Sequence, residues 1–383
     1  MKTTINTNEL EIKTGEKEEP PDSSQINEPP GFYFAKQNKV LEPKVKGFYF
    51  AKQNKVLESK TKGFYFAEQN KVLESKTKGF YFAKQNKVEI ISDIETCYSL
   101  WQEFSPKETL FDTWEFRYAF YLGYKYKPYF ILLKRNNEVL GILPLWHDLT
   151  RKKYFWFGSD WQEENKFFVK DKIFLPLLLN LAPSPLFLNA IDSKIPLLSS
   201  KFKFLWDDSK YILELKNFKS SEDFLMSLKK NRRRDLRKDR NRILKQNPKI
   251  VFNRFSDFKK LVNLAKKRFA QKGESVDWKD KRRVETFSQV INLKGLSYEL
   301  RMLSVYIGRK IAGVDLIALY GNTYYALKCG YDVKNFPGIG NFINLIEIDD
   351  ALKLNLGKID FLQNNYQWKS RWFQEVPLLK YEK

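Results

Sequence analysis

The order of apolar and polar positions predicts alternating helices and strands along most of the chain. In the first such region, a helix-like pattern at 109–124 precedes strand-like runs at 129–134 and 139–146. Asn136-Asn137 separates the two runs and gives them the form of a β-hairpin. Further aromatic strand-like runs follow, so this region predicts a unit that mixes helices with strands.

A second unit begins after a polar joint. Its first helical pattern opens at Ser220, with Asp223 three residues later in a capping arrangement, and stops before Pro248. Two more helical patterns and three strand-like runs follow, at 255–273, 282–293, 298–308, 310–321 and 323–332. We therefore predict an α/β or α+β fold with mixed sheets, in two similar domains at 89–215 and 216–383.

The first 88 residues have a different composition. Residues 1–30 are acidic and contain Pro and Ser, which is typical of a disordered leader. Within residues 31–88, four copies of GFYFAKQNKV begin 16 residues apart, at Gly31, Gly47, Gly63 and Gly79. Each copy reads as a short strand, a polar turn at QNK and a second short strand, a pattern that can also stack or self-associate.

The repeat copies are nearly identical, which favours a recent tandem duplication. The fourth copy runs directly into a strand pattern at Val88, Ile90 and Ile91. We therefore interpret the first three copies as an appended, solvated arm without chemistry of its own, and expect it to be disordered.

The chain has 383 residues, 43% of them apolar, and a formal net charge of +22. Such a charge favours anionic partners such as nucleic acid, phosphorylated cofactors or an acidic membrane surface. Cys97 and Cys329 are too few for a disulfide framework, and with His147 as the single histidine we expect no metal site. The apolar run from Ile173 is too short to span a bilayer, and no secretory signal opens the chain, so we expect a cytoplasmic protein.

A Pro-Gly turn near the C-terminus carries the strongest chemical signal. Residues 336–362 read FPGIGNFINLIEIDDALKLNLGKIDFL, which predicts a helix between two strands, with Gly357 as its C-cap glycine. The helix has one apolar stripe, formed by Leu345, Ile348, Leu352 and Leu356. Free amides and the positive end of the helix dipole converge at such a turn, so we expect it to bind a phosphate or pyrophosphate.

The same turn carries a family resemblance. Asn335-x-x-Gly338-x-Gly340 resembles the acyl-CoA loop of the GNAT acyltransferase superfamily, Gln/Arg-x-x-Gly-x-Gly/Ala, with Asn at its first position. Over roughly residues 89–375, the order of segments is similar to the CelD-type acetyltransferase family, within the group that includes the FemABX peptidyltransferases. These segments are TLFDTWEFRYAFYLGY, PYFILLKRNNEVLGILPL, FLMSLKKNRRRDLRKDRNRI, LRMLSVYIGRKIAGVDLIALY and YDVKNFPGIGNFINLIEIDDALKLNLGKIDFLQNNYQWKSRW.

This resemblance implies two tandem GNAT-like domains and an acyltransferase that uses acyl-CoA, such as acetyl-CoA, without a metal. The acceptor would be an amine or hydroxyl of a small-molecule or cell-envelope/polysaccharide precursor. The pantetheine arm is expected between the strands at 323–331 and 359–362, with the donor carbonyl polarised by a backbone amide. The implied donor contacts are Asn335, Gly338, Ile339, Gly340 and Asn341.

Residues just after the second of these strands are candidates for catalysis. Asp360 could orient or deprotonate the acceptor, and Tyr366 could supply a proton. Lys369 matches the lysine of the Tyr/x-Lys-x-x-Trp/Phe ending in the resembled family. For each of them, an ordinary solvated surface charge is the alternative interpretation.

Three arginines are candidates for binding an anionic substrate. Arg371 follows the same strand, whereas Arg232 and Arg233 belong to a helix with 10 Lys or Arg against two Asp between Lys229 and Lys245. CoA phosphates, an acidic acceptor or RNA would suit such a face. A solvated face is again the alternative.

Two other functions stay open at this level. A FemABX-like transferase would use aminoacyl-tRNA as donor, which suits the positive charge and makes tRNA a possible partner. The second alternative is a non-catalytic basic scaffold with an adhesive repeat arm. Such a protein could also contact a membrane surface peripherally. Only the second unit has a Pro-Gly turn that opens a helix, so a single active site is expected there.

Overall fold

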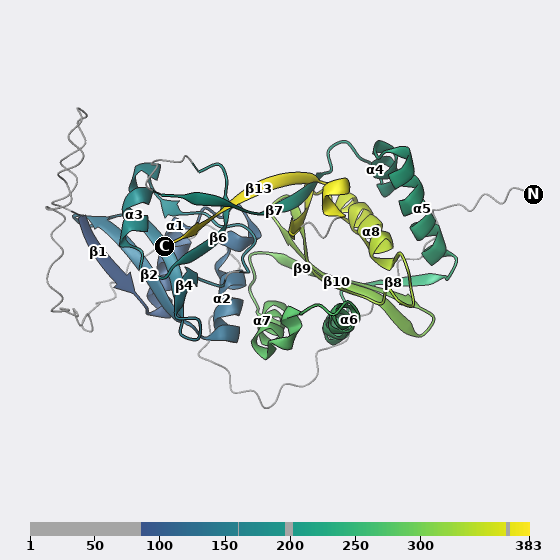
Figure 1. The fold of residues 1–383 in the computed structure, drawn as a ribbon, viewed down its shortest axis with the longest axis horizontal. Helices are drawn as coiled ribbons and strands as arrows, with labels where there is room; N and C mark the ends of the chain where they lie inside the picture. The colour runs from purple at the N-terminus through teal and green to yellow at the C-terminus, as the bar shows by residue number, and fades with distance from the viewer. Residues whose placement is uncertain (1–85, 160, 196–201, 365–367) are drawn as a thin grey trace, which may run out of the picture.

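The computed structural model describes residues 86–159, 161–195, 202–364 and 368–383. Helices flank two β-sheets in this part of the chain, so the predicted α/β class with mixed sheets is confirmed (Figure 1). Residues 1–85, with the predicted leader and most of the repeats, lie outside the described residues.

The first sheet has the strand order β1-β2-β3-β4, and the short strand β5 also pairs with β3. Its strands are β1 (Asn86–Ile91), β2 (Lys127–Arg135), β3 (Glu138–Asp148), β4 (Lys153–Trp156) and β5 (Phe168–Val169). The predicted hairpin is confirmed, because β2 and β3 pair antiparallel and Asn136 takes the left-handed conformation with φ of 55° between them.

Strand β1 shows where the repeat enters the fold. Asn86 and Lys87 pair with Arg135 and Lys134 of β2. In the fourth copy these two residues therefore lie in a strand, and the predicted turn at QNK is wrong there. Pairing with β2 supplies backbone partners that a local turn would not.

Three helices belong to the first half of the chain, namely α1 (Ile94–Phe104), α2 (Trp114–Tyr124) and α3 (Leu175–Leu181). The apolar run from Ile173 supplies α3, where Pro176 lies in the first turn and removes no helical hydrogen bond. None of the described helices combines the length and apolar character that crossing a bilayer requires.

The second sheet has eight strands in the order β6-β13-β7-β12-β11-β10-β9-β8. They are β6 (Phe187–Asp192), β7 (Phe204–Glu214), β8 (Pro248–Phe252), β9 (Glu299–Ile307), β10 (Lys310–Tyr320), β11 (Thr323–Tyr331), β12 (Lys358–Gln363) and β13 (Gln374–Glu382). Although β6 and β7 fall in the predicted first domain, 89–215, they pair with β13 from the end of the chain. The second sheet is therefore built from both halves of the sequence.

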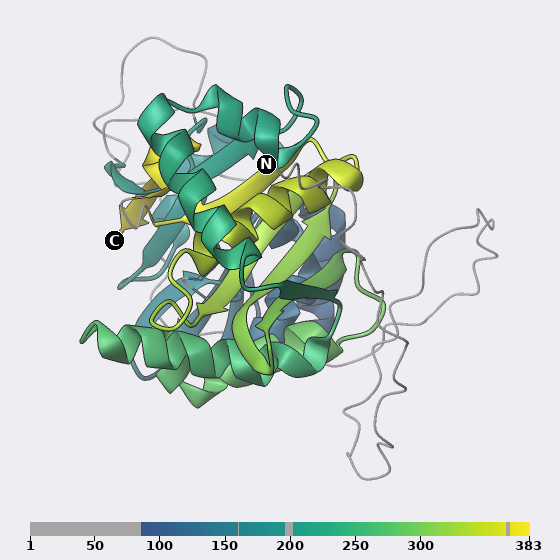
Figure 2. The same ribbon diagram turned by 90° about the vertical axis from the view of Figure 1, so that its right-hand side faces the viewer.

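Five helices surround the second sheet, namely α4 (Ser221–Ser227), α5 (Lys230–Leu244), α6 (Phe258–Gln271), α7 (Lys281–Asn292) and α8 (Ile339–Lys353). The side chain of Ser220 caps α4 as predicted, but the backbone turns extended at Leu228 and divides the predicted helix in two. Helix α8 lies between the sheet and α5, while α6 and α7 cover the opposite face (Figure 2).

One hydrophobic core joins the two halves of the chain. It contains Trp101 and Trp114 from the first half together with Phe287 and Leu327 from the second. Helix α2 packs so closely on α7 that a Cβ at Gly123 would lie 2.1 Å from Oγ1 of Thr286. The halves therefore share buried apolar surface, which fixes how loops of the first half meet strands of the second.

Candidate active site

Strands β11 and β12 are parallel neighbours joined by α8, which confirms the predicted β-α-β unit. They pair at only three positions, Thr323–Tyr325 with Lys358–Asp360, and β11 then continues without β12 beside it. Strand β11 also has a bulge, because Ala326 and Lys328 pair with consecutive residues of β10 and Leu327 has no partner there. The two strands therefore separate next to an irregular piece of backbone.

The turn before α8 has the geometry of a helix start that can receive an anion. Gly338 is the N-cap and has φ of 91°, a conformation that glycine adopts without a Cβ clash. Phe342 donates to the carbonyl of Gly338, whereas the amides of Gly340 and Asn341 have no backbone acceptor within the described residues. These two amides lie at the N-terminal end of α8, which is the positive end of the helix dipole.

A carboxylate from α5 lies over this turn. A Cβ built on Gly338 would be 2.7 Å from Cβ and Cγ of Asp239. The side-chain amide of Asn341 donates to Asp239 (2.7 Å), and Arg242 donates both to Asp239 (3.2 Å) and to the carbonyl of Pro337 (3.3 Å). An acidic side chain thus occupies the place that the helix dipole favours for an anion, and an arginine lies beside it.

The C-terminal end of α8 differs from the prediction. The helix ends at Lys353, so Leu356 is outside it, and Asn355 takes the left-handed conformation (φ of 55°) expected of the residue after a helix. The prediction of Gly357 as the C-cap glycine is therefore wrong. The amide of Gly357 instead donates to Oδ1 of Asn322 (2.6 Å). This hydrogen bond connects the segment before β12 to the β10–β11 turn.

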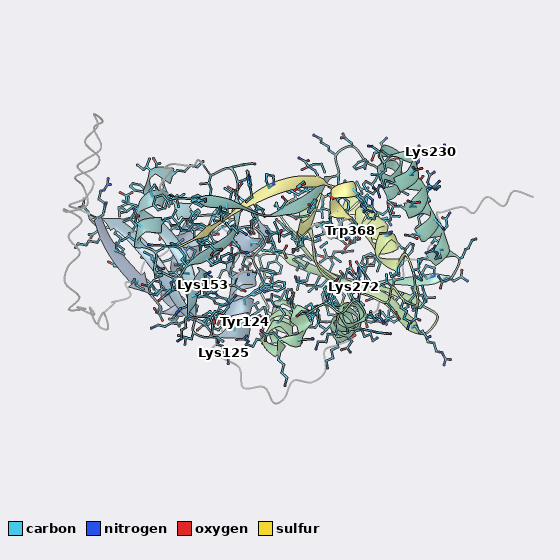
Figure 3. All side chains as sticks on the ribbon, in the orientation of Figure 1. Tyr124, Lys125, Lys153, Lys230, Lys272 and Trp368 are labelled. Atoms are coloured by element: carbon cyan, nitrogen blue, oxygen red, sulfur yellow. The ribbon has the colours of Figure 1, made fainter. Side chains whose placement is uncertain are left out.

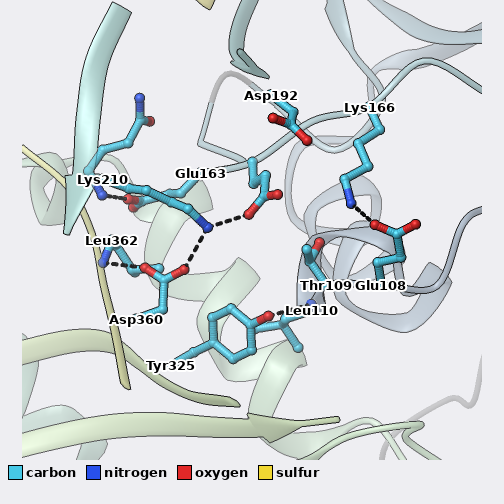
Figure 4. Close-up of polar contacts among 12 residues, drawn as sticks. Glu108, Thr109, Leu110, Glu163, Lys166, Asp192, Lys210, Tyr325, Asp360 and Leu362 are labelled. Carbon is cyan, nitrogen blue, oxygen red and sulfur yellow. Dashed lines mark hydrogen bonds and ion pairs between the residues drawn. The ribbon is translucent and has the colours of Figure 1, made fainter. Parts of the chain in front are cut away.

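Asp360 is buried in an ion cluster at the point where β11 and β12 separate (Figure 4). Its Oδ2 accepts from Lys210 of β7 (2.9 Å), and its Oδ1 accepts from the amide of Leu362 (2.9 Å). Lys210 also pairs with Glu164, which lies on the loop between β4 and β5. Burial works against the charge of Lys210, but Asp360 and Glu164 together raise its pKa above the ordinary value.

Lys369 is buried just below the same strand end. Its Nζ donates to the carbonyls of Phe361, Leu362 (3.3 Å) and Gln363 (2.7 Å). Burial lowers the pKa of Lys369 to about 8, although Glu163 opposes this shift. Lys369 therefore fixes the end of β12 and changes charge near neutral pH.

A small pocket opens between the two halves at the separation of β11 and β12. Glu163 lies at its edge, where its Oε2 accepts from the amide of Gln363 (2.6 Å) and its Oε1 is 3.9 Å from Nζ of Lys328. Burial raises the pKa of Glu163 and lowers that of Lys328. The pocket is lined by Phe111, Phe116, Phe120, Trp161, Glu163, Phe287, Leu327, Lys328 and Leu362.

The structure places the remaining predicted residues away from this pocket. Asn335 is exposed and donates its side-chain amide to Asp332 (2.7 Å), within its own turn. Arg233 donates to the carbonyl of Met226 (3.1 Å), and Arg371 is exposed. Tyr366 lies outside the described residues.

Ile339 and the predicted arginines of α5 also lie outside the pocket lining. Ile339, the first residue of α8, is fully buried, and Arg232 is half-buried on the first turn of α5. Lys230, also on the first turn of α5, lies on the outer side of the molecule (Figure 3). Asp239 and Arg242, in the last two turns of α5, contact the glycine turn, whereas Arg232 and Arg233 lie in the first turn, at the other end of this helix.

Comparison with known proteins bears on the region of the glycine turn. Residues 230–370 match the family model described as acetyltransferase (GNAT) domain. This part of the chain is therefore similar to GNAT acetyltransferase domains. The predicted resemblance to GNAT acyltransferases is confirmed, and the match supports a transferase enzyme. The matched region contains α5, the glycine turn, β11, β12 and Lys369.

Two solved structures show a related fold over both halves of the chain. FemX has a TM-score of 0.51 and 11% identity, over 77% of this chain and 97% of its own. A conserved protein of unknown function from Bacteroides thetaiotaomicron has a TM-score of 0.50 and 12% identity, over 78% of this chain and all of its own. A search of curated proteins found no match.

Proposed function

We propose that the protein transfers an acyl group from acyl-CoA to an amine or hydroxyl of a small-molecule or cell-envelope precursor. The GNAT domain supports acyl transfer in general. The observation that carries the proposal is the separation of β11 from β12 after Tyr325 and Asp360, beside the pocket and next to the glycine turn.

The donor would lie along this gap. Its diphosphate would bind the amides of Gly340 and Asn341, where it takes the place of the carboxylate of Asp239. Arg242 already lies within hydrogen-bond reach of that carboxylate and would pair with the diphosphate instead. The pantetheine arm would then pass between the strands toward Leu327 and the pocket.

The acceptor would meet the thioester beside the pocket, whose free space of about 10 Å³ holds no more than a water molecule. Glu163 is the acidic side chain of the pocket lining, and burial raises its pKa above that of an ordinary carboxyl, which makes it a stronger general base. It would take a proton from the protonated amine or hydroxyl. The freed lone pair would attack the thioester carbon, the C–S bond would break, and CoA would leave as the thiol after it gains a proton.

Asp360 and Lys369 would act by positioning. Asp360 is paired with Lys210, and Lys369 holds three carbonyls at the end of β12. Both therefore fix the strand that borders the gap, and a backbone amide there would polarise the donor carbonyl. Direct catalytic roles for Asp360 and for Tyr366 remain predictions.

Turnover with a panel of acceptors tests this proposal. Acetyl-CoA and longer acyl-CoAs are incubated with amines, amino sugars and hydroxyl compounds, and free CoA is measured by chromatography. We expect CoA release that depends on one acceptor class and is lost in Glu163→Gln. Folded protein that neither binds nor consumes any acyl-CoA would contradict the proposal.

A second candidate donor, aminoacyl-tRNA, is favoured by one observation. Helix α5 exposes cationic residues, including Lys230, Arg234 and Lys238, and a carboxylate covers the glycine turn. Phosphate contacts from such a helix would bind RNA in a salt-dependent way. Retained nucleic acid in purified protein, seen in the ratio of absorbance at 260 and 280 nm, separates this donor from acyl-CoA.

A further inference from the structure

Lys328 of β11 contributes a primary amine to the lining of the pocket. It lies beyond Tyr325, the last residue of β11 that pairs with β12, so β12 is no longer beside the strand at this position. Its side chain is 20% exposed, and its Nζ lies 4.6 Å from the ring centre of Trp161 and 3.9 Å from Oε1 of Glu163. The amine therefore lies where the proposed path of the donor reaches the proposed base.

Two other lysines near the end of β12 hold their amines in fixed contacts. Nζ of Lys369 donates to three backbone carbonyls, and Nζ of Lys210 pairs with two carboxylates. In contrast, Nζ of Lys328 donates no hydrogen bond within the described residues, and its distance to Glu163 is longer than a hydrogen bond. Lys328 can therefore lose a proton and turn its amine without breaking a hydrogen bond.

The surroundings of Lys328 favour its neutral amine. Burial lowers the pKa of Lys328, Glu163 opposes this shift, and Arg283 reinforces it. The guanidinium carbon of Arg283 lies 3.3 Å from the centre of the same Trp161 ring, so two cations share one aromatic neighbour. The neutral amine is the nucleophilic form of lysine, and a nearby cation is a known means of activating it.

We propose that Lys328 is a self-acylation site, at which the protein transfers an acyl group from acyl-CoA to its own lysine amine. The inference rests on the proposed function, because it uses the same donor and the same base. Glu163 takes a proton from the ammonium group, and the amine of Lys328 attacks the thioester carbon. The C–S bond breaks, and CoA leaves as the thiol after it gains a proton. The product is an amide at Nζ, and no oxidant or further reactant is needed.

Acylation of Lys328 changes the pocket in two ways. It removes a positive charge that lies 3.9 Å from Glu163, and it adds an acyl group where the free space holds no more than a water molecule. The acylated side chain then occupies the place where an external acceptor would meet the base. Turnover of an external acceptor should therefore fall as acylated Lys328 accumulates.

Mass spectrometry of the full chain, incubated with acetyl-CoA and no other acceptor, tests the proposal. The reference is Lys272, whose side chain is 49% exposed and reports uncatalysed acylation by the thioester. We expect acetylation, located by peptide mapping, to be at least about tenfold faster at Lys328 than at Lys272. Equal rates at the two lysines would overturn the proposal.

Matched variants separate catalysed from uncatalysed acylation. Glu163→Gln should reduce the rate at Lys328 to that at Lys272, whereas Glu164→Gln, which changes the neighbouring carboxylate, should leave it unchanged. The glutamine can still accept from the amide of Gln363, so the contact that holds this loop on β12 is kept. Acetylation of Lys328 that is as fast in Glu163→Gln as in wild type would overturn the proposal.

Turnover of an external acceptor distinguishes this inference from the proposed function. Protein that acylates an external acceptor but leaves Lys328 unmodified would overturn self-acylation alone. Folded protein that binds no acyl-CoA would overturn the proposed function and self-acylation together.

Discussion

The carboxylate of Asp239 lies directly over Gly338, with its Cβ and Cγ 2.7 Å from the position that a Cβ of this glycine would take. The contact explains why the turn tolerates only glycine in this fold, because both the left-handed φ and the lack of a side chain are used. It also places a negative charge where the donor diphosphate would bind. The affinity for CoA should therefore depend on the charge of this one side chain.

Asp239→Asn and Arg242→Gln should change CoA affinity in opposite directions. The first removes a negative charge that competes with the diphosphate, so we expect binding about tenfold tighter. The second removes the neighbouring cation, so we expect binding about tenfold weaker. Isothermal titration with CoA measures both, and Arg232→Gln, on the same helix, is the control. Unchanged affinity in both variants would place the diphosphate elsewhere.

Glu163→Gln should remove the acidic limb of the pH profile. Burial raises the pKa of Glu163, so a base at this position gains activity as pH rises through a value above that of an ordinary carboxyl. We expect kcat to fall by about 100-fold or more in the variant. Glu164→Gln changes the neighbouring carboxylate, which pairs with Lys210, and should keep the acidic limb. Loss of the limb in both variants would mean a structural effect.

Lys369 should determine the decline of activity at high pH, the basic limb of the pH profile. Its pKa, lowered by burial to about 8, means that its charge disappears as pH rises through that value. The three carbonyls at the end of β12 then lose a cationic donor, so we expect activity to decline above about pH 8. Lys369→Arg keeps the charge and should shift this decline upward, with a lower maximal rate. A basic limb that is identical in the variant would exclude Lys369 as its source.

Glu347→Gln should stabilise the protein at neutral and higher pH. Glu347 on α8 and Asp315 on β10 form a buried carboxyl pair, and Tyr331 donates to Asp315 (2.6 Å). Burial, together with the neighbouring carboxyl, raises the pKa of Glu347 well above its ordinary value. The folded state therefore holds more protons than the unfolded state above about pH 4.5, and stability is lost as pH rises from there.

Urea unfolding measures the effect of Glu347→Gln. We expect the variant to match wild type near pH 4.5 and to gain about 1 kcal/mol or more in free energy of unfolding at pH 8. Asp350→Asn, one turn later on α8, is the contrast, because Asp350 pairs with Arg301 (2.8 Å) and its loss should destabilise. A pH-independent difference between Glu347→Gln and wild type would show that the pKa of Glu347 is not raised in the folded state.

Local patterns predicted several parts of the fold well. The capping residue Ser220, the hairpin at Asn136 and the strand-turn-helix at Gly338 each depend on neighbours within a few residues, and all are found in the structure. Strand β13 was not predicted, because Pro377 interrupts its pattern and its partners β6 and β7 are far away in the chain.

The candidate site was predicted only in part for a related reason. Asp360 and Lys369 follow the glycine turn closely in sequence, whereas Glu163 reaches the pocket from a loop about 200 residues earlier. Nothing in the segment WQEEN marks Glu163 as different from Glu164. Asp239 was also unmarked, because its effect depends on how α5 packs on α8. Contacts between distant segments are the information that a single sequence pattern lacks.

Titration of wild-type protein with CoA, acetyl-CoA and pantetheine tests the donor site most directly. Pantetheine lacks the diphosphate that the amides of Gly340 and Asn341 would hold. We expect CoA and acetyl-CoA to bind, and pantetheine to bind at least about 100-fold more weakly. Equal binding of all three ligands, or no binding of any to folded protein, would contradict it.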